Sequence, residues 1–164
     1  MKKFSYLLVV AMFMSACGQR APRTAADAHD VHTPVQLGEV RRGVIAGSQE
    51  DLETRAGNMI HFEFDRHSLT PEATEILRRQ AAWLQQFPRV NIIIEGHADN
   101  RGTRQYNLAL GERRANAAMR FLIAQGVPAS RITTVSYGKD RPIRLGNTEE
   151  DHAMNRRGVT LIVN

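Results

Sequence analysis

The stretch that decides the fold is residues 90–126, VNIIIEGHADNRGTRQYNLALGERRANAAMRFLIAQG. It opens with a mostly apolar, β-branched run, which predicts a central strand that Gly96 closes. From about Thr103 to Gln125 the apolar residues recur with the helical period, and Gly126 marks the end of a helix. The expected buried face of this helix includes small residues that allow close packing on a sheet: Leu108, Gly111, Ala115, Ala118 and Leu122. The stretch therefore predicts a strand, a polar loop and a long helix.

A second strand and a second helix are expected upstream of this stretch. Residues 59–64 alternate with the period of a strand. One face of that strand would hold its apolar residues, Ile60, Phe62 and Phe64. Thr70 and Pro71 predict a helix start, as N-cap and first-turn residue, and Pro88 stops this helix. Its apolar stripe consists of Ala73, Ile76, Leu77, Ala81 and Leu84.

Shorter elements are expected at both ends of the folded part. Residues 132–137 and 159–163 have the composition of strands, and the polar segment 140–157 between them is expected to carry a short helix. Residues 48–51, SQED, either cap a short helix or lead into an edge strand. The whole pattern predicts an α/β (α+β) two-layer sandwich, in which two main helices pack on one face of a mixed four-stranded sheet.

The start of the chain has the pattern of an export signal. A positive region, Lys2-Lys3, precedes an apolar run at residues 4–14, and Ser15-Ala16 supplies the small residues that signal peptidases accept before a cut. About eleven apolar residues reach only roughly 16 Å as a helix, whereas a bilayer core needs about twenty residues. Residues 1–16 are therefore expected to be a signal peptide rather than a permanent membrane span.

Cys17, the only cysteine in the chain, follows this run in the context Met14-Ser15-Ala16-Cys17. That context resembles the lipobox of bacterial lipoproteins, although the first position is usually Leu. The resemblance implies that Cys17 carries the lipid anchor, and that Gly18, by not being Asp, favours sorting to the outer membrane. The alternative is a chance cysteine beside an ordinary cleavage site. A cysteine consumed by lipid leaves no disulfide, so the core alone must stabilise the domain.

The segment from Gly18 to about Gly47 predicts no packed structure. It is rich in Ala, Arg, Pro, Gly and Thr and has no aromatic residue, so it cannot bury enough apolar area to offset its ordering entropy. Together with Cys17 it is expected to form a flexible tether, residues 17–47. Its thirty or so residues have an average reach on the order of 30 Å. The folded domain is then expected to cover residues 48–164.

Charge and composition exclude several classes of function. The formal net charge of +5 falls by two, to +3, when the signal and its lysines are removed. The sequence pI near 10.0 would suggest nucleic acid as a partner for a cytosolic protein, but an exported protein does not meet nucleic acid. The six histidines lack metal-ligand spacings, and no Ser/His/Asp constellation is present. We therefore expect no metal, no cofactor and no catalytic residue, and expect His97 to pack in its loop.

The densest polar cluster lies where the first strand is expected to end and the long helix to begin, at residues 95–103, EGHADNRGT. Ligand sites in α/β folds favour such loops. Further motifs occur in fixed order: Phe62-Glu63-Phe64-Asp65, Tyr106-Asn107, Leu110-Gly111-Glu112-Arg113-Arg114-Ala115-Asn116-Ala117, Val135-Ser136-Tyr137-Gly138-Lys139 and Asn155-Arg156-Arg157. Over roughly residues 58–164 this set resembles the OmpA-like peptidoglycan-binding domain, in particular its peptidoglycan-associated lipoprotein (Pal) branch.

The resemblance implies a ligand, the free end of a diaminopimelate side chain in the peptide stem of peptidoglycan. This end carries an ammonium and a carboxylate on one carbon. Asp99 and Arg114 match the family's binding pair, so the aspartate would take the ammonium and the arginine the carboxylate. The resemblance also implies that main-chain NH groups near Phe64 and Asp65 bind the same carboxylate. The alternative for Asp99 is that it caps the long helix expected from about Thr103, or pairs internally with an arginine.

Two further residues of the cluster, Arg101 and Asn107, are candidate ligand residues. Asn100 departs from the acidic residue that is common at its position in Pal proteins, so no contribution is assigned to it. Adjacent residues on a helix point about 100° apart, so Arg113 and Arg114 cannot both face the site. The match to the family favours Arg114.

Three functions follow from these patterns. By resemblance to Pal, the first is a lipoprotein on the periplasmic face of the outer membrane that binds peptidoglycan. It would also serve the Tol-Pal system in envelope integrity and cell division, with a TolB-type β-propeller protein and TolA as partners. The second is a periplasmic peptidoglycan hydrolase or amidase that uses His97 or the carboxylates. The third is an OmpA-like lipoprotein without Tol function. The first is the prediction.

Overall fold

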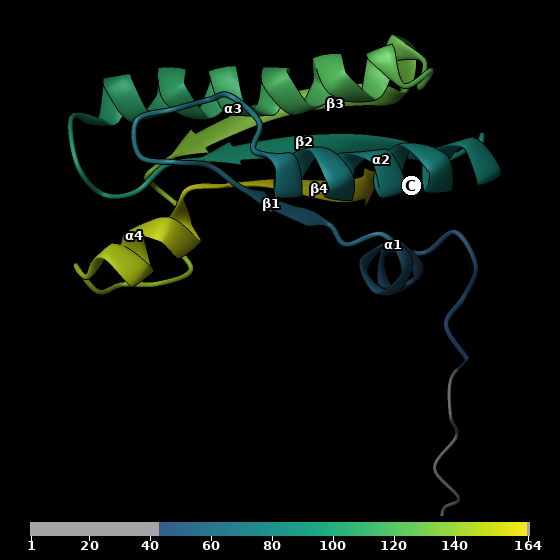
Figure 1. Ribbon diagram of the computed structural model, residues 1–164, viewed down its shortest axis with the longest axis horizontal. Helices are drawn as coiled ribbons and strands as arrows, with labels where there is room; N and C mark the ends of the chain where they lie inside the picture. Colours follow the sequence, from purple (N-terminus) through teal and green to yellow (C-terminus); the bar gives the residue numbers. More distant parts are fainter. Residues whose placement is uncertain (1–42, 164) are drawn as a thin grey trace, which may run out of the picture. The chain divides into compact units, whose positions relative to one another are not determined.

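The computed structural model describes residues 43–163. The expected signal peptide, Cys17 and most of the expected tether lie outside the described residues. The elements follow one another as shown in Figure 1: α1 (Gln49–Arg55), β1 (Met59–His61), α2 (Pro71–Gln86), β2 (Asn91–His97), α3 (Arg104–Ala124), the 3-10 helix η1 (Ala129–Arg131), β3 (Ile132–Gly138), α4 (Glu149–Asn155) and β4 (Arg157–Val163). None of the described helices combines the length and the hydropathy that a membrane crossing requires.

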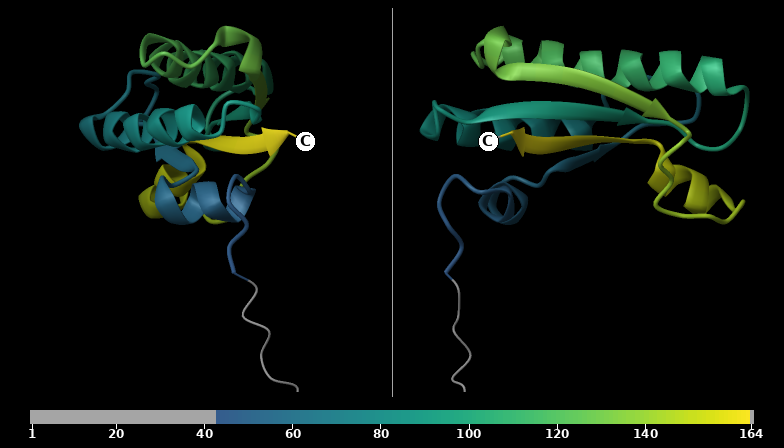
Figure 2. Two further views of the ribbon diagram at one scale, coloured as in Figure 1. Left: turned by 90° about the vertical axis from the view of Figure 1, so that its right-hand side faces the viewer. Right: turned by 180° about the vertical axis from the view of Figure 1, so that it is seen from behind.

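The four strands form one mixed sheet in the order β1-β4-β2-β3. Strand β2 runs parallel to β3, with Ile94 opposite Thr134, and antiparallel to β4, with Ile94 opposite Thr160. Helices α2 and α3 lie on one face of this sheet, and Figure 2 shows that no helix of the described residues covers the opposite face. The predicted sandwich, with two main helices on one face of a mixed four-stranded sheet, is confirmed.

The two main helices begin where the sequence predicts. The Thr70 hydroxyl accepts a hydrogen bond from the Ala73 amide (3.1 Å) at the start of α2, and Pro71 is its first residue. Thr103 caps α3 in the same way. The core between these helices and the sheet contains Leu77, Leu84, Ile92, Ile94, Ala115, Ala118 and Leu122, all fully buried. Burial of this apolar surface is the main force that holds the two layers together.

Strand β1 is shorter than predicted. Only Met59–His61 pairs with β4 as a strand, and the Phe62 amide then donates to the Arg156 carbonyl (2.9 Å). The chain turns away at Asp65, which has a positive φ of 55°, and the Arg66 amide closes the turn on the Glu63 carbonyl. The prediction that Phe64 shares the buried face with Ile60 and Phe62 is therefore wrong, because the Phe64 side chain is 57% exposed.

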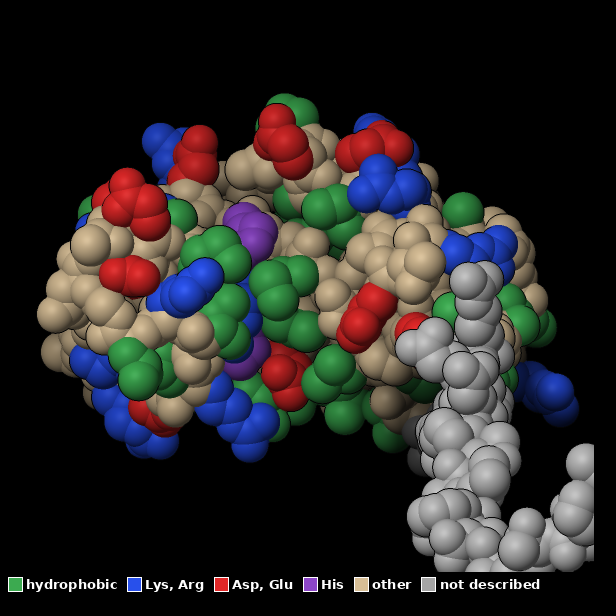
Figure 3. Space-filling model, turned by 90° about the horizontal axis from the view of Figure 1, so that it is seen from below, with side chains coloured by type: hydrophobic (Ala, Val, Ile, Leu, Met, Phe, Trp, Pro, Cys, Tyr) green, Lys and Arg blue, Asp and Glu red, His purple; other side chains and the backbone are tan. Residues whose placement is uncertain are grey.

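The helix alternative for residues 48–51 is confirmed, because the Ser48 hydroxyl caps α1. The next residue, Gln49, completes the edge of β4 beyond the end of β1. Its side-chain amide donates to the Thr160 carbonyl (3.3 Å) and accepts from the Ile162 amide (2.9 Å). Figure 3 shows the side of the domain that carries α1 and α4, where hydrophobic side chains gather between the two helices.

Two glycines let α3 lie directly on the sheet. A Cβ atom on Gly96 of β2 would overlap the carbonyl oxygen of Gly111 in α3, and a Cβ atom on Gly111 would overlap the Ser136 hydroxyl of β3. Ser136 uses the short distance to donate to the Leu108 carbonyl (2.6 Å). The close approach sets the distance of α3 from the sheet and the rotation of α3 about its own axis. It thereby also sets the positions of the side chains in the N-terminal half of α3.

Candidate ligand-binding site

A pocket of about 180 Å³ opens between the β1–α2 loop, the β2–α3 loop and the first half of α3. It is lined by Phe64, Asp65, Asp99, Arg101, Gly102, Tyr106, Asn107, Leu110 and Arg114. All six predicted ligand residues are in this set: Asp99, Arg114, Phe64, Asp65, Arg101 and Asn107. The structure therefore brings together residues that lie up to fifty positions apart in the sequence.

Arg114 is fully buried, and its guanidinium joins the two loops that form the pocket. Nε donates to the Arg66 carbonyl (2.8 Å), one terminal nitrogen donates to the His97 carbonyl (2.7 Å), and the other donates to the Glu63 carbonyl (3.1 Å). Burial lowers the pKa of Arg114 to about 10, and the nearby Asp99 carboxylate opposes this shift. The guanidinium therefore remains charged at neutral pH.

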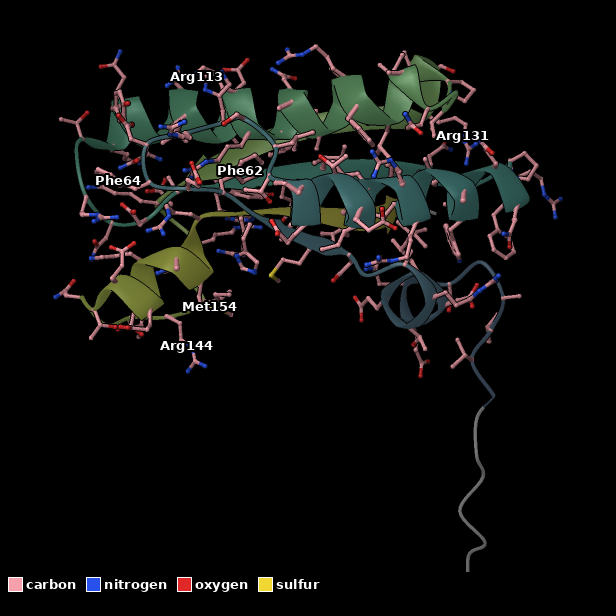
Figure 4. The ribbon with its side chains drawn as sticks, viewed as in Figure 1. Phe62, Phe64, Arg113, Arg131, Arg144 and Met154 are labelled. Carbon is pink, nitrogen blue, oxygen red and sulfur yellow. The ribbon has the colours of Figure 1, made fainter. Side chains whose placement is uncertain are left out.

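Arg113, the neighbour of Arg114 in the sequence, lies outside the pocket. Figure 4 shows its side chain on the side of α3 that faces away from the sheet, and its guanidinium lies 5.9 Å from the centre of the Tyr106 ring. The helical rotation between adjacent residues accounts for the difference. Of the two arginines, the structure places only Arg114 in the pocket.

Asp99 is almost completely buried, with 5% of its surface exposed, and it accepts three hydrogen bonds. Arg101 supplies two of them, from its side chain (2.5 Å) and its amide (3.1 Å), and Arg156 supplies the third (3.4 Å). Burial by itself would raise the pKa of Asp99, but these hydrogen bonds outweigh burial and hold the pKa below its usual range.

These contacts decide between the alternatives for Asp99 in the ligand-free molecule. The helix-cap alternative is wrong, because the Thr103 hydroxyl accepts the Tyr106 amide (3.2 Å) at the start of α3. The alternative that Asp99 pairs internally with an arginine is confirmed by its contacts with Arg101 and Arg156. The carboxylate still lines the pocket.

The rim of the pocket is formed by aromatic and charged side chains. The exposed Phe64 ring stacks against the Arg101 guanidinium at 4.0 Å. The Tyr106 hydroxyl donates to the Asp65 carboxylate, which ties the β1–α2 loop to α3, and this hydrogen bond raises the pKa of Tyr106. The buried Asn107 amide donates to the Arg101 carbonyl (2.7 Å) and thereby fixes the β2–α3 loop.

The folded part of the chain is similar to known proteins. Residues 61–156, more than half of the chain, match the OmpA family. The chain is 44% identical to the peptidoglycan-associated lipoprotein of Agrobacterium fabrum over 142 residues, which cover 84% of this chain and 80% of that protein. The chain belongs to the OmpA family and, within it, to the peptidoglycan-associated lipoproteins.

Solved structures agree with this membership. The crystal structure of the peptidoglycan-associated lipoprotein from Burkholderia pseudomallei is similar with a TM-score of 0.63 and 38% identity, over 65% of this chain and 90% of that one. The C-terminal domain of Helicobacter pylori MotB is similar with a TM-score of 0.61 and 25% identity, over 65% of this chain and 84% of that one.

Some residues of the site escaped prediction. Tyr106 belongs to a motif of the OmpA family, but its contact with Asp65 was not predicted. Asp65 has a positive φ, and no local sequence pattern predicted this conformation. Arg156 also belongs to a motif, Asn155-Arg156-Arg157. Glu149 of α4 forms ion pairs with Arg101 (3.2 Å) and Arg156 (2.8 Å). No sequence pattern indicated Glu149 as a site residue, because these ion pairs join distant parts of the chain.

His97 does not line the pocket. It is buried, stacks on Tyr137 and places Nε2 3.2 Å from the Glu95 carboxylate. Burial, with smaller contributions from Arg157 and Arg141, lowers its pKa to about 4, so the ring is neutral at pH 7. No group of three or more His, Cys, Asp or Glu side chains within residues 43–163 is arranged to hold a metal ion.

Proposed function

We propose that this chain binds peptidoglycan noncovalently, through the diaminopimelate of the peptide stem, and connects the outer membrane to the cell wall. One observation carries the proposal: Asp99 and Arg114, of opposite charge and both buried, line the same small pocket. Membership among the peptidoglycan-associated lipoproteins supports the same wall ligand.

The chemistry of the ligand suits this pair. The free end of diaminopimelate carries an ammonium, which Asp99 would accept, and a carboxylate on the same carbon, which Arg114 would bind. A guanidinium has five N–H donors, and the three carbonyl contacts of Arg114 leave donors for a ligand. Phe64 and Asp65 line the same pocket, and their main-chain NH groups would supply further donors. Two charge-assisted contacts of about 1.5 to 3 kcal/mol each, less the entropy of binding, give micromolar affinity.

The attachment to the membrane would use the other end of the chain. Cys17 would carry the acyl chains on the periplasmic face of the outer membrane, and residues 17–47 would be the tether between membrane and domain. Each buried lipid CH₂ contributes about 0.8 kcal/mol, so two or more acyl chains anchor stably. Many weak wall contacts combined with this anchor hold more firmly than either attachment alone.

As part of this proposal, the chain acts in the Tol-Pal system, in envelope integrity and cell division, with a TolB-type β-propeller protein and TolA as partners. The resemblance of residues 58–164 to the Pal branch is the reason for proposing this role. A pull-down of the full chain with the purified propeller protein tests it. Retention of the propeller is expected, and no retention would leave an OmpA-like lipoprotein without Tol function.

The binding test is co-sedimentation of the full chain with purified cell-wall sacculi, followed by titration with a diaminopimelate-containing stem peptide. We expect Asp99→Ala and Arg114→Ala to weaken binding at least tenfold, because each leaves one charge of the ligand without its partner. Arg113→Ala is the matched control, because it removes an adjacent but exposed arginine. A thermal melt of each variant establishes that it is folded, since Arg114 also holds three carbonyls.

Two results would contradict the proposal. Unchanged affinity of both folded variants would remove the pair from the mechanism. Release of soluble wall fragments by the wild-type chain would instead indicate a hydrolase.

A further inference from the structure

In the ligand-free molecule, the carboxylate proposed to bind the ligand ammonium is already paired with a cation of the same chain. The Arg101 guanidinium lies 2.5 Å from one oxygen of Asp99, and the Arg101 amide lies 3.1 Å from the other. A carboxylate has about four acceptor positions, and Arg156 uses a third. One position is left, so an incoming ammonium that makes more than one of its three possible hydrogen bonds to Asp99 has to take the place of one of these donors.

The Arg101 side chain is the donor that is free to leave. Arg156 is held on other sides, because its Nε donates to the Phe62 carbonyl (3.0 Å) and its other terminal nitrogen pairs with Glu149 (2.8 Å), and its side chain is only 8% exposed. The Arg101 side chain is 36% exposed, and its Nε has no partner among the described residues.

The Arg101 guanidinium has other partners besides Asp99. One terminal nitrogen already bonds Glu149 (3.2 Å), and the flat face rests on the Phe64 ring at 4.0 Å. Both partners are more than half exposed. Arg101 and Arg114 line the same pocket, so the guanidinium can leave Asp99 and still face a ligand that occupies this pocket.

We propose that Arg101 is an exchangeable counter-ion, which leaves Asp99 for the ligand's carboxylate when the ligand's ammonium takes its place. This inference rests on the proposed function and adds a specificity-determining residue to it. A ligand with both charges exchanges partners with the Asp99–Arg101 pair, so neither side chain is left without a partner of opposite charge. A ligand with an ammonium alone displaces Arg101 from Asp99 and offers no carboxylate that Arg101 could bind. Arg101 would thus make the pocket reject simple amines.

The arrangement also explains how Asp99 remains charged before the ligand arrives. An ionised carboxylate with 5% exposure is costly to bury without a partner. Arg101 supplies that partner in the free protein and releases it only in exchange for another cation.

The test compares two stem peptides that differ only in the carboxylate: L-Ala-γ-D-Glu-meso-diaminopimelate and L-Ala-γ-D-Glu-L-Lys. Calorimetric titration of the full chain is expected to show that the wild type prefers the diaminopimelate peptide. In Arg101→Ala the affinity for the lysine peptide should rise about fivefold, as expected for removal of one partly exposed competing ion pair. The affinity for the diaminopimelate peptide should stay within about twofold, because the lost competitor and the lost carboxylate contact offset each other.

Arg104→Ala is the matched control. It removes the same charge three positions away, where Arg104 pairs with Asp140 and does not line the pocket, so the preference for diaminopimelate should not change. Thermal melts of both variants check that they are folded.

Any result other than this change in preference contradicts either the exchange at Arg101 or the proposed binding of diaminopimelate. An equal rise for both peptides would make Arg101 a competitor without exchange. A loss of diaminopimelate binding with unchanged lysine binding would make it an ordinary carboxylate ligand. Unchanged binding of both peptides would remove Arg101 from recognition. Any of these overturns the inference and leaves the proposed function intact, whereas a wild-type chain that binds neither peptide overturns the proposed function itself.

Discussion

A single buried arginine connects the ligand pocket with the loops that form it. Arg114 donates to carbonyls of Glu63 and Arg66 in one loop and of His97 at the end of β2. Removal of one partner from such a buried charged network costs several kcal/mol, because the remaining groups are left without hydrogen bonds. The same residue would therefore shape the site and bind the ligand, and its substitution is informative only when the variant is shown to be folded.

At the residue scale, His97 makes a prediction about pH. Its pKa in the folded protein is about 4, below the ordinary 6.5, mainly because it is buried. Between these values the unfolded chain binds a proton that the folded chain does not, so the free energy of unfolding decreases as the pH falls through this window. The loss from this residue is on the order of 3 kcal/mol between pH 7 and pH 4. Urea unfolding at a series of pH values measures it.

The variant His97→Gln isolates this contribution. It is expected to be less stable than the wild type at pH 7, because it loses the stacking on Tyr137, but its stability should decrease less steeply between pH 6.5 and 4.5. His67→Gln, which removes an exposed histidine, is the control and should keep the wild-type slope. A His97→Gln slope equal to that of the wild type would show that His97 is not the group responsible.

Among the elements, the contact between α3 and the sheet is set by the pair Gly96 and Gly111. Alanine normally favours a helix interior by about 1 kcal/mol over glycine. At Gly111 the added methyl group would overlap the Ser136 hydroxyl and the Gly96 carbonyl, so α3 would have to lift away from β2 and β3. Gly111→Ala is therefore expected to lower the free energy of unfolding by about 2 kcal/mol or more, despite its better helix propensity.

Chemical denaturation of the full chain measures this change. Gly43→Ala is the control, because no atom lies within 4 Å of the position of its Cβ, and it should leave the stability unchanged. Peptide binding should weaken along with stability in Gly111→Ala, since Arg114 lies one turn further along the same helix. A more stable Gly111→Ala variant would refute the close contact.

The sequence predicted the main elements because their signals are local. The caps of α2 and α3 and the period of their apolar residues depend on neighbours within a few positions, and the structure has the helices there. The end of β1 was mispredicted for the opposite reason. Phe64 continues the alternating pattern, but the chain turns there, and carbonyls on both sides of Phe64, those of Glu63 and Arg66, accept hydrogen bonds from Arg114, about fifty positions away. The alternation of residues 59–64 carries no information about these hydrogen bonds.

The candidate site also contains both residues that the sequence indicated and residues that it did not. Asp99, Arg101 and Asn107 lie within nine positions of one another, and a polar loop before a helix indicated them together. Glu149, the first residue of α4, and Arg156, between α4 and β4, also belong to the charge network, and only the sheet order, which places β4 beside β2, brings them near Asp99. Ion pairs across that distance have no period or spacing by which a single sequence reveals them.

At the scale of the whole molecule, the proposed anchor makes a prediction about Cys17. After expression of the full chain in a bacterium with an outer membrane, the wild type is expected in the membrane fraction. Cys17→Ser should appear in the soluble periplasmic fraction, because it has no thiol for the acyl chains, and should still sediment with isolated cell walls. Immunoblots of both fractions measure the distribution. Persistent membrane association of Cys17→Ser after digestion of the wall would contradict lipid anchoring at this residue.

Strand β2 separates the two ends of the domain that the proposed function would use. Gly47, near the start of the described residues, lies next to Phe87 and so close to the start of β2. The β2–α3 loop, which lines the pocket, follows the other end of this strand, and Figure 1 shows the two ends of β2 far apart. Seven residues of strand span about 23 Å. A pull between membrane and wall would therefore act along the strands and would load the hydrogen bonds between β1, β4 and β2 in shear. Hydrogen bonds that are loaded in shear have to break at the same time. The domain would therefore unfold slowly under a stretching force.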